Sequence, residues 1–298
     1  MSNSNQSSFQ SFKLAEILGK GGCGTVYRAT LTQDLRELQA GSPIAVKIVH
    51  PELLESNIVL GRLRREVEIG MRVRSPNVVA IYGVEKCKMY SRLTLAILMD
   101  LIEGVTLKEK YSRTSLGEGA LLMIAHEAAS GLDAIHSLGI VHRDIKPANL
   151  MLTAKRRVVI TDLGIARLPD ISARVTATGS FIGTCGYASP EQFANTEILD
   201  PRSDLYSLGV VLYELGTGIN PFKSDNLIKT IQAHMREIVA PPSTRNPTLS
   251  SDFDNLVMSL LEKKREDRPE SAKKLMKIVE GFWTSDEQTQ AIPPITFD

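Results

Sequence analysis

The stretch VHRDIKPANLML, at residues 141–152, limits what this 298-residue chain can fold into more than any other segment. Apolar residues flank a centre that holds Arg143, Asp144, Lys146 and Asn149. A surface turn needs no apolar flanks, and a buried charge without a partner is costly. We therefore expect a loop that the core holds on both sides while its polar side chains face specific partners.

The residue types in this loop suit phosphate chemistry. Asp144 can accept a proton from an attacking hydroxyl group, Lys146 can neutralise a phosphoryl group, and the amide oxygen of Asn149 suits a hard divalent cation. Farther along, Asp162 ends a strand-like run in VVITDLG and offers a second hard oxygen ligand. Phosphoryl transfer from a magnesium nucleotide requires such a set.

A glycine cluster, GKGGCG at residues 19–24, fits the spacing G-x-G-x-x-G. The same spacing occurs in dinucleotide-binding folds, where a helix follows the glycines. Here the strand-like run TVYRA follows, which favours a hairpin whose backbone N–H groups lie over phosphates. A plain flexible hairpin tip is the alternative that this motif alone leaves open.

Lys47 lies within the apolar run IAVKIV and needs a partner for its charge. Its long side chain can reach solvent at the edge of the sheet, or it can hold phosphate oxygens while a carboxylate fixes it. Glu66 and Glu68 are the candidates for that carboxylate, on a segment with helical spacing from about residue 57 to residue 74. Ser75-Pro76 is expected to stop this helix.

Hydrophobic periodicity divides the chain into a strand-rich first hundred residues and a helical remainder, with a seam near residues 100–104. Such a division predicts an α+β fold with two lobes, and ligands often bind between lobes. The predicted strands cover residues 12–18, 25–29, 44–49, 78–84 and 93–101, and the predicted helices cover residues 116–139, 203–218, 251–264 and 271–283.

Composition narrows the classes of function. The 35 basic and 34 acidic residues nearly balance, so bulk charge gives no reason to expect nucleic acid or a membrane surface as the main partner. Cys23, Cys87 and Cys185 are far apart, which indicates a reducing compartment and no metal cluster. No run reaches the ~20 apolar residues of a membrane helix, so we expect a cytoplasmic chain.

The combined motifs resemble the eukaryotic-like (Hanks-type) serine/threonine protein kinase family, and most closely its bacterial members. In order, the matching segments are GKGGCGTV, AVK, HRDIKPAN, DLG and GTCGYASPE. The resemblance covers about residues 12–282. It implies a bilobal protein kinase fold, with a small antiparallel-sheet N-lobe that has one main helix and a larger helical C-lobe.

The resemblance implies a kinase domain at residues 12–283 (N-lobe 12–101, C-lobe 102–283). The polar composition of the two ends predicts a disordered leader at residues 1–11 and a flexible tail or linker stub at 284–298. Relatives of this kind often continue into a membrane helix and a sensor domain. The chain is therefore either cytoplasmic as a whole or the cytosolic domain of a longer membrane protein.

By resemblance, Asp144 would be the catalytic base, Lys146 the γ-phosphate contact, and Asn149 and Asp162 the ligands of Mg²⁺ or Mn²⁺. Lys47 would hold the α- and β-phosphates of ATP, and spacing to Pro76 favours Glu66 as its partner. The remaining nucleotide contacts would be Leu18, Gly19, Gly21, Gly22, Gly24, Val26, Ala45, Met99, Asp100, Ile102 and Met151. His142 and Asp204 would anchor the loop backbone, and Glu191 would pair with Arg268.

Lys146, two residues after Asp144, and Thr184 in GTCGY are the residues typical of serine/threonine kinases at these positions. They imply that the acceptors are serine and threonine hydroxyls of protein substrates. Autophosphorylation would fall on the activation segment, and a homodimer would let it occur in trans. The phosphosites would be Thr176, Thr178 and Ser180, and the residues pairing with phosphate would be Arg143, Arg167 and Arg62. For the arginines on the helix before Pro76, a solvated surface remains an open alternative.

Two other functions stay open as alternatives. A pseudokinase scaffold would have lost Lys47, Asp144, Asn149 or Asp162, and all four are present. A small-molecule phosphotransferase would not need the peptide-facing run around Thr184. Departures from the family pattern are DLG in place of DFG, SPE in place of APE, and Gly70, where many relatives carry an apolar side chain.

Overall fold

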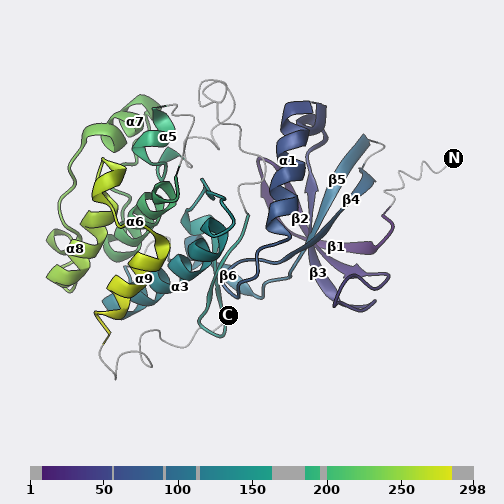
Figure 1. Cartoon of the computed structure of the whole chain (residues 1–298), viewed down its shortest axis with the longest axis horizontal. Coiled ribbons are helices and arrows are strands. Elements are labelled where there is room, and N and C mark those ends of the chain that lie inside the picture. The colour runs from purple at the N-terminus through teal and green to yellow at the C-terminus, as the bar shows by residue number, and fades with distance from the viewer. Residues whose placement is uncertain are drawn as a thin grey trace. The chain divides into compact units, whose positions relative to one another are not determined.

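The computed structural model describes residues 9–55, 57–89, 92–111, 115–162, 185–194 and 200–283, without the side chains of residues 57–59, 62, 65, 66 and 69. These residues divide into two compact units (Figure 1). The sheet unit contains residues 9–74 and 79–102, and the helical unit contains residues 75–78, 103–162 and the described residues from 185 to 283.

The sheet unit is built on a five-stranded antiparallel sheet in the order β1-β2-β3-β5-β4. Its core is apolar: Ile44, Val46 and Ile48 of β3 are all at most 4% exposed. The glycine cluster lies at the β1–β2 hairpin, where Gly21 pairs with Gly24. The elements are β1 (Phe12–Gly21), β2 (Gly24–Leu31), β3 (Pro43–Val49), η1 (Pro51–Glu55), α1 (Asn57–Gly70), β4 (Ile81–Met89) and β5 (Arg92–Met99).

Most predicted boundaries lie within four residues of the observed ones, and two of the differences have a clear physical reason. The helix α1 ends at Gly70, ahead of Ser75-Pro76, because glycine is a poor helix former and already weakens the last turn. The strand β4 begins at Ile81, three residues after the predicted start. Val78 instead forms a parallel bridge with Ile160 in the helical unit, so the expected strand is shared between two sheets.

The helical unit packs around α6, in which thirteen residues are buried. Gly209 of α6 approaches α8 so closely that an added Cβ would lie 2.7 Å from Cβ of Leu260. The elements are β6 (Gly104–Thr106), α2 (Leu107–Tyr111), α3 (Glu118–His136), η2 (Pro147–Asn149), β7 (Leu150–Thr153), β8 (Val158–Ile160), α5 (Pro190–Phe193), α6 (Arg202–Thr217), α7 (Leu227–Arg236), η3 (Pro242–Thr244), α8 (Ser251–Leu260), η4 (Arg265–Asp267) and α9 (Ala272–Glu280).

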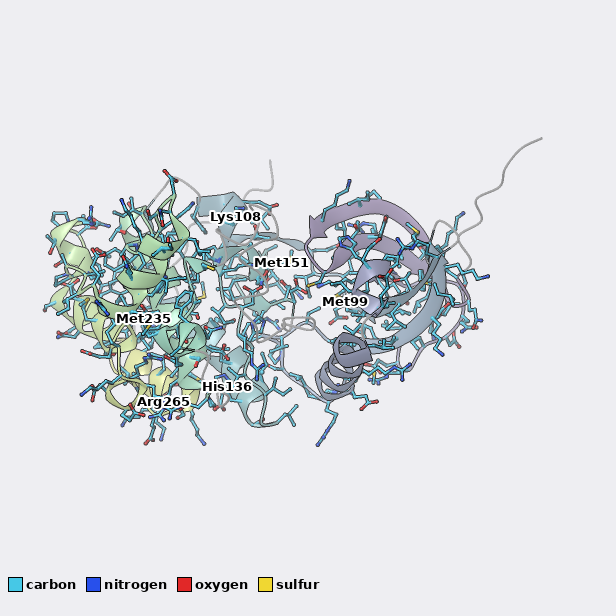
Figure 2. The ribbon with its side chains drawn as sticks, turned by 90° about the horizontal axis from the view of Figure 1, so that it is seen from above. Met99, Lys108, His136, Met151, Met235 and Arg265 are labelled. Atoms are coloured by element: carbon cyan, nitrogen blue, oxygen red, sulfur yellow. The ribbon has the colours of Figure 1, made fainter. Side chains whose placement is uncertain are left out.

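The predicted helices from residue 116 onward are confirmed as α3, α6, α8 and α9. The helix α7 was not predicted, because its apolar residues do not all face the core: Ile228 is 65% exposed and Met235 is 39% exposed (Figure 2). One unit is an antiparallel sheet with one main helix, and the other is larger and mostly helical. This confirms the predicted α+β class. Within the described ranges, every helix is too short or too polar to cross a bilayer.

Candidate active site

A buried carboxylate fixes the backbone of the loop at residues 141–149. Asp204, at the start of α6, is fully buried and accepts hydrogen bonds from the backbone N–H groups of His142 at 2.7 Å and Arg143 at 2.8 Å. His136 Nε2 lies 2.8 Å from the same carboxylate. Burial opposes the charge of Asp204, but the hydrogen bonds from the His136 ring and from the backbone N–H of His142 outweigh it and hold the pKa of this carboxyl below its usual value. The expected bracing role of Asp204 is confirmed.

His142 anchors the loop as a neutral ring. Its Nδ1 accepts the backbone N–H of Asp144 at 3.3 Å, and its Nε2 lies 3.3 Å from the carbonyl oxygen of Thr161. Complete burial lowers the pKa of His142, although the nearby carboxylates of Asp204 and Asp144 act in the opposite direction. The ring therefore joins the loop to the chain that follows β8, as expected of an anchoring residue.

The polar side chains of the loop converge on Asp144. Lys146 Nζ donates to Asp144 Oδ2 at 3.0 Å, and Asn149 Nδ2 donates to the same oxygen at 3.0 Å and to the Asp144 carbonyl at 2.9 Å. These bonds orient the amide group of Asn149, and its Oδ1 is left as the atom that a divalent cation would need. The apolar flanks supply the support: Ile145, Leu150 and Leu152 are at most 1% exposed.

Asp162 is positioned through the backbone of β7 and β8. The N–H of Thr161 donates to the carbonyl of Asn149 at 2.9 Å, which brings the start of the DLG motif beside the loop at residues 141–149. Asp162 has φ of 59° and Arg143 has φ of 66°, values that non-glycine residues seldom adopt. Such backbone conformations often occur at functional sites.

Arg143 carries a polar group that the described residues do not satisfy. Its Nε is buried and has no hydrogen-bond partner among them. The backbone carbonyl of Arg143 accepts a bond from Gln192 Nε2 at 3.2 Å. A buried guanidinium nitrogen in this state is suited to receive an anion.

In the sheet unit, strand register positions the residues expected to contact a nucleotide. Lys47 is only 7% exposed and pairs with Val26 on β2 and Ile97 on β5. A strand follows the glycine hairpin, so the helix that a dinucleotide-binding motif requires is absent from that position. Leu18 on β1 is 46% exposed.

The end of β5 is fixed by two hydrogen bonds. Met99 pairs with Ala45 on β3 and is labelled in Figure 2. The N–H of Asp100 donates to the Ala80 carbonyl at 2.9 Å, and the Tyr82 hydroxyl donates to the Asp100 carboxylate. Burial and the Asp100 carboxylate raise the pKa of Tyr82, so its hydroxyl remains a donor. No local pattern in the sequence indicates this role of Tyr82.

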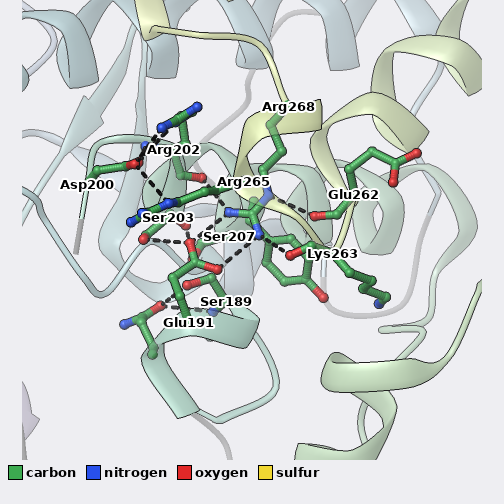
Figure 3. Close-up of polar contacts among 12 residues, drawn as sticks. Ser189, Glu191, Asp200, Arg202, Ser203, Ser207, Glu262, Lys263, Arg265 and Arg268 are labelled. Carbon is green, nitrogen blue, oxygen red and sulfur yellow. Dashed lines mark hydrogen bonds and ion pairs between the residues drawn. The ribbon is translucent and has the colours of Figure 1, made fainter. Parts of the chain in front are cut away.

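The predicted ion pair between Glu191 and Arg268 is confirmed (Figure 3). Arg268 Nη1 and Nη2 donate to the two Glu191 oxygens at 2.7 and 3.0 Å. Its other bonds go to the carbonyls of Glu262, Lys263 and Arg202. Burial opposes ionisation of Glu191, but Arg268 outweighs it and lowers the pKa of this carboxyl.

Several predicted residues lie outside the described parts of the chain. Their roles stay predictions: Thr184, Arg167, Thr176, Thr178, Ser180, and the side chains of Glu66 and Arg62. Among the described residues, no cluster of three His, Cys, Asp or Glu side chains is arranged to hold a metal ion. An Asn–Asp pair suits Mg²⁺, which keeps water and phosphate oxygens as its other ligands.

Comparison with known proteins agrees with this geometry. Residues 12–279 match the model of the protein kinase domain. The serine/threonine-protein kinase PknB of Mycobacterium tuberculosis is 36% identical over 263 residues, which cover 88% of this chain and 41% of the relative. The serine/threonine-protein kinase pkn3 of Myxococcus xanthus is 33% identical over 271 residues, 88% of this chain and 48% of the relative. The chain thus spans less than half of the length of these curated relatives.

Proposed function

Because this chain belongs to the protein kinase family, we propose that it transfers the γ-phosphoryl group of ATP to serine and threonine hydroxyls of proteins. The bond between the γ-phosphorus and its bridging oxygen breaks, and a bond to the substrate oxygen forms. ADP leaves, and the hydroxyl proton passes to a carboxylate of the enzyme.

One observation carries the proposal. Asp144 lies in a loop whose backbone Asp204 fixes from a buried position, while Lys146 and Asn149 both contact Asp144 at 3.0 Å. In this arrangement Asp144 accepts the proton of the substrate hydroxyl, and Lys146 neutralises charge that develops on the transferring group. Because the loop is already fixed before the substrate binds, little free energy has to be spent on ordering it during the reaction.

Members of this family use ATP and a divalent metal ion, and we propose Asn149 and Asp162 as the metal ligands. Mg²⁺ or Mn²⁺ held there would neutralise phosphate charge. On the sheet unit, we propose that Lys47 binds the α- and β-phosphates, paired with Glu66, and that the glycine hairpin covers them. The proposed adenine contacts are Leu18, Val26, Ala45, Met99, Asp100, Ile102 and Met151.

We further propose that the chain phosphorylates its own activation segment at Thr176, Thr178 or Ser180. The buried, unsatisfied Nε of Arg143 supports this, because a phosphate group would give that nitrogen a charge-assisted bond. Arg167 and Arg62 would share the phosphate. Reaction between two copies in a transient homodimer is the proposed route. Mass-spectrometric mapping of the phosphosites after incubation with ATP tests the assignment.

Transfer of radiolabel from [γ-³²P]ATP to a generic protein substrate tests the main proposal. Asp144→Asn and Lys47→Met should each lower the rate by about 10²–10⁴-fold, as expected for groups that act on the reacting atoms. Equal labelling by these variants and the parent chain would contradict the proposal. Nucleotide binding without transfer by the parent would favour the scaffold alternative.

The relatives are much longer than this chain, and we propose the same kinase activity for the whole protein. We propose protein substrates, and a location in the cytosol for the domain described here. Labelling of a small molecule in place of protein would identify a phosphotransferase of related fold, which the peptide-facing run at residues 184–192 disfavours.

A further inference from the structure

Residues 185–187, which lie just before α5, are held by side chains from distant parts of the helical unit. Asn220 Nδ2 donates to the Gly186 carbonyl at 2.8 Å. The hydroxyl of Tyr187 donates to Glu214 Oε2 at 2.5 Å. The segment belongs to the run GTCGYASPE, which the proposed function assigns to peptide binding. Its backbone therefore bears on how a protein substrate fits.

The amide of Asn220 is fixed at both ends. While its Nδ2 bonds to Gly186, its Oδ1 accepts the backbone N–H of Phe222 at 3.0 Å. Phe222 is 2% exposed, so the turn that carries Asn220 is anchored in the core. The preceding helix α6 ends at Gly218, whose φ of 78° lets the chain turn back toward residue 186. Asn220 is thus a rigid donor.

A second residue, His234, lies close to the same segment of the chain, residues 185–187. His234 of α7 is fully buried, and its Nδ1 lies 2.9 Å from the Tyr206 hydroxyl. The backbone carbonyls of Gly186 and Cys185 lie close enough to influence its ring, yet burial and the Lys263 charge lower its pKa to about 3. The neutral ring packs against Phe222, at 4.4 Å between ring centroids, and so lies beside the turn that carries Asn220.

We propose that Asn220 is a positioning residue for substrate binding, because its bond to the Gly186 carbonyl sets the shape of the peptide-facing segment at residues 185–187. The inference rests on the proposed kinase function. It predicts that Asn220 affects how tightly a peptide binds and which side chain beside the target hydroxyl is accepted. The chemical step itself should not depend on it.

The chain offers a matched control in Asn246. Its Nδ2 donates to the Gly216 carbonyl at 2.8 Å, and its Oδ1 accepts the backbone N–H of Thr248, two residues on. Asn220 makes the same two kinds of bond, also to a glycine carbonyl and to an N–H two residues on. The difference is that Asn246 holds the end of α6, whereas Asn220 holds the segment at residues 185–187.

Steady-state kinetics of Asn220→Ala and Asn246→Ala test the proposal, with a peptide substrate and ATP varied in turn. Loss of one such bond should raise the KM for peptide about fivefold in Asn220→Ala, with kcat and the KM for ATP nearly unchanged. Peptides varied beside the target hydroxyl should also change rank. Asn246→Ala should lower the melting temperature comparably without changing the KM for peptide. Asn220→Asp, which keeps the shape but loses the donor, should behave like Asn220→Ala.

Hydrogen exchange separates failure of this inference from failure of the proposed function. The amides of Tyr187 and Ala188 should exchange faster in Asn220→Ala than in Asn246→Ala, whether or not the chain transfers phosphate. If the parent labels no peptide, the proposed function fails, and exchange still decides the positioning role. Unchanged exchange at these amides, or equal peptide KM values in the two alanine variants, would overturn the inference.

Discussion

The two units fix their functional residues in different ways. In the helical unit, the loop at residues 141–149 is held by buried side chains, with Asp204 accepting the N–H groups of His142 and Arg143. In the sheet unit, Lys47 and Ala45 are placed by strand register, on a core of apolar side chains. Buried hydrogen bonds between polar groups fix one geometry. When one partner is removed, the other stays buried without a hydrogen bond, which costs free energy. Strand register tolerates side-chain changes wherever the backbone has room.

Asp204→Ala should have the largest effect, because three donors would lose a buried acceptor. We expect a loss of about 3–5 kcal/mol of unfolding free energy and at least a 10²-fold fall in kcat as the loop moves. Urea unfolding and the transfer assay measure the two effects. Stability and kcat close to the parent values would mean that the loop is held by other contacts.

Arg268→Met should cost about 3–5 kcal/mol, because Glu191 would remain buried without its guanidinium partner. The double variant Glu191→Gln with Arg268→Met should lose less, since no buried charge is then left unpaired. Urea unfolding of the two single variants and the double variant measures the coupling. Additive losses would show that the pair acts as two independent contacts.

Gly24→Ala probes the sheet unit where backbones approach closely. An added Cβ would lie 2.3 Å from the Ile48 carbonyl oxygen, so we expect a loss of about 1–3 kcal/mol. At Gly22 nothing lies within 4 Å, and Gly22→Ala should stay within about 0.5 kcal/mol of the parent. Thermal unfolding of Gly24→Ala and Gly22→Ala measures the difference. Equal shifts of the melting temperature would show that the close approach of β2 and β3 at Gly24 does not limit the side chain there.

His234→Gln should make the helical unit less sensitive to acid. The pKa of His234 is about 3 in the folded protein, against about 6.5 in an unfolded chain. Between these pH values the unfolded state binds more protons, so stability falls as the pH falls, by up to about 1.4 kcal/mol per pH unit. Unfolding free energies from pH 6.5 down to the lowest pH of reversible folding measure the slope. An unchanged slope in the variant would contradict the assignment.

Arg92→Ala should have the smallest effect. Arg92 in the sheet unit bonds Glu52 at 2.5 Å and Glu55 at 2.9 Å, but its side chain is 52% exposed. Solvent screens such a pair, so the expected loss of stability is the smallest of those predicted and shrinks with added salt. Urea unfolding at low and high salt checks it. A loss as large as that of Arg268→Met would erase the distinction between the units.

Much of the fold was predictable because its signals are local. Alternation and apolar runs gave the strands, and helical spacing that ends in glycine gave α3 and α6. The helix α7 was missed because its face is partly exposed at Ile228. The place of Val78, beside Ile160, depends on a contact between residues far apart in sequence, which no local pattern encodes.

For the site, the residue types in the HRDIKPAN loop were enough to predict phosphate chemistry. The structure adds the partners that hold it, such as His136 on Asp204 and Gln192 on the Arg143 carbonyl. Those are single side-chain contacts across the helical unit, and many sequences of the same pattern would lack them. Asn220 is another case, since an asparagine after a helix more often caps a local turn than fixes a distant carbonyl.

The bond from Arg268 to Glu191 also sets an order of events during synthesis. The two residues are 77 positions apart, and Arg268 comes last. At ordinary translation rates the ribosome needs roughly 4–15 seconds to make that stretch. Throughout that interval the carboxylate of Glu191 lacks the Arg268 guanidinium with which it pairs in the folded chain. The residues of the sheet unit are synthesised before Glu191, so this unit can fold before the last segment of the helical unit has been made.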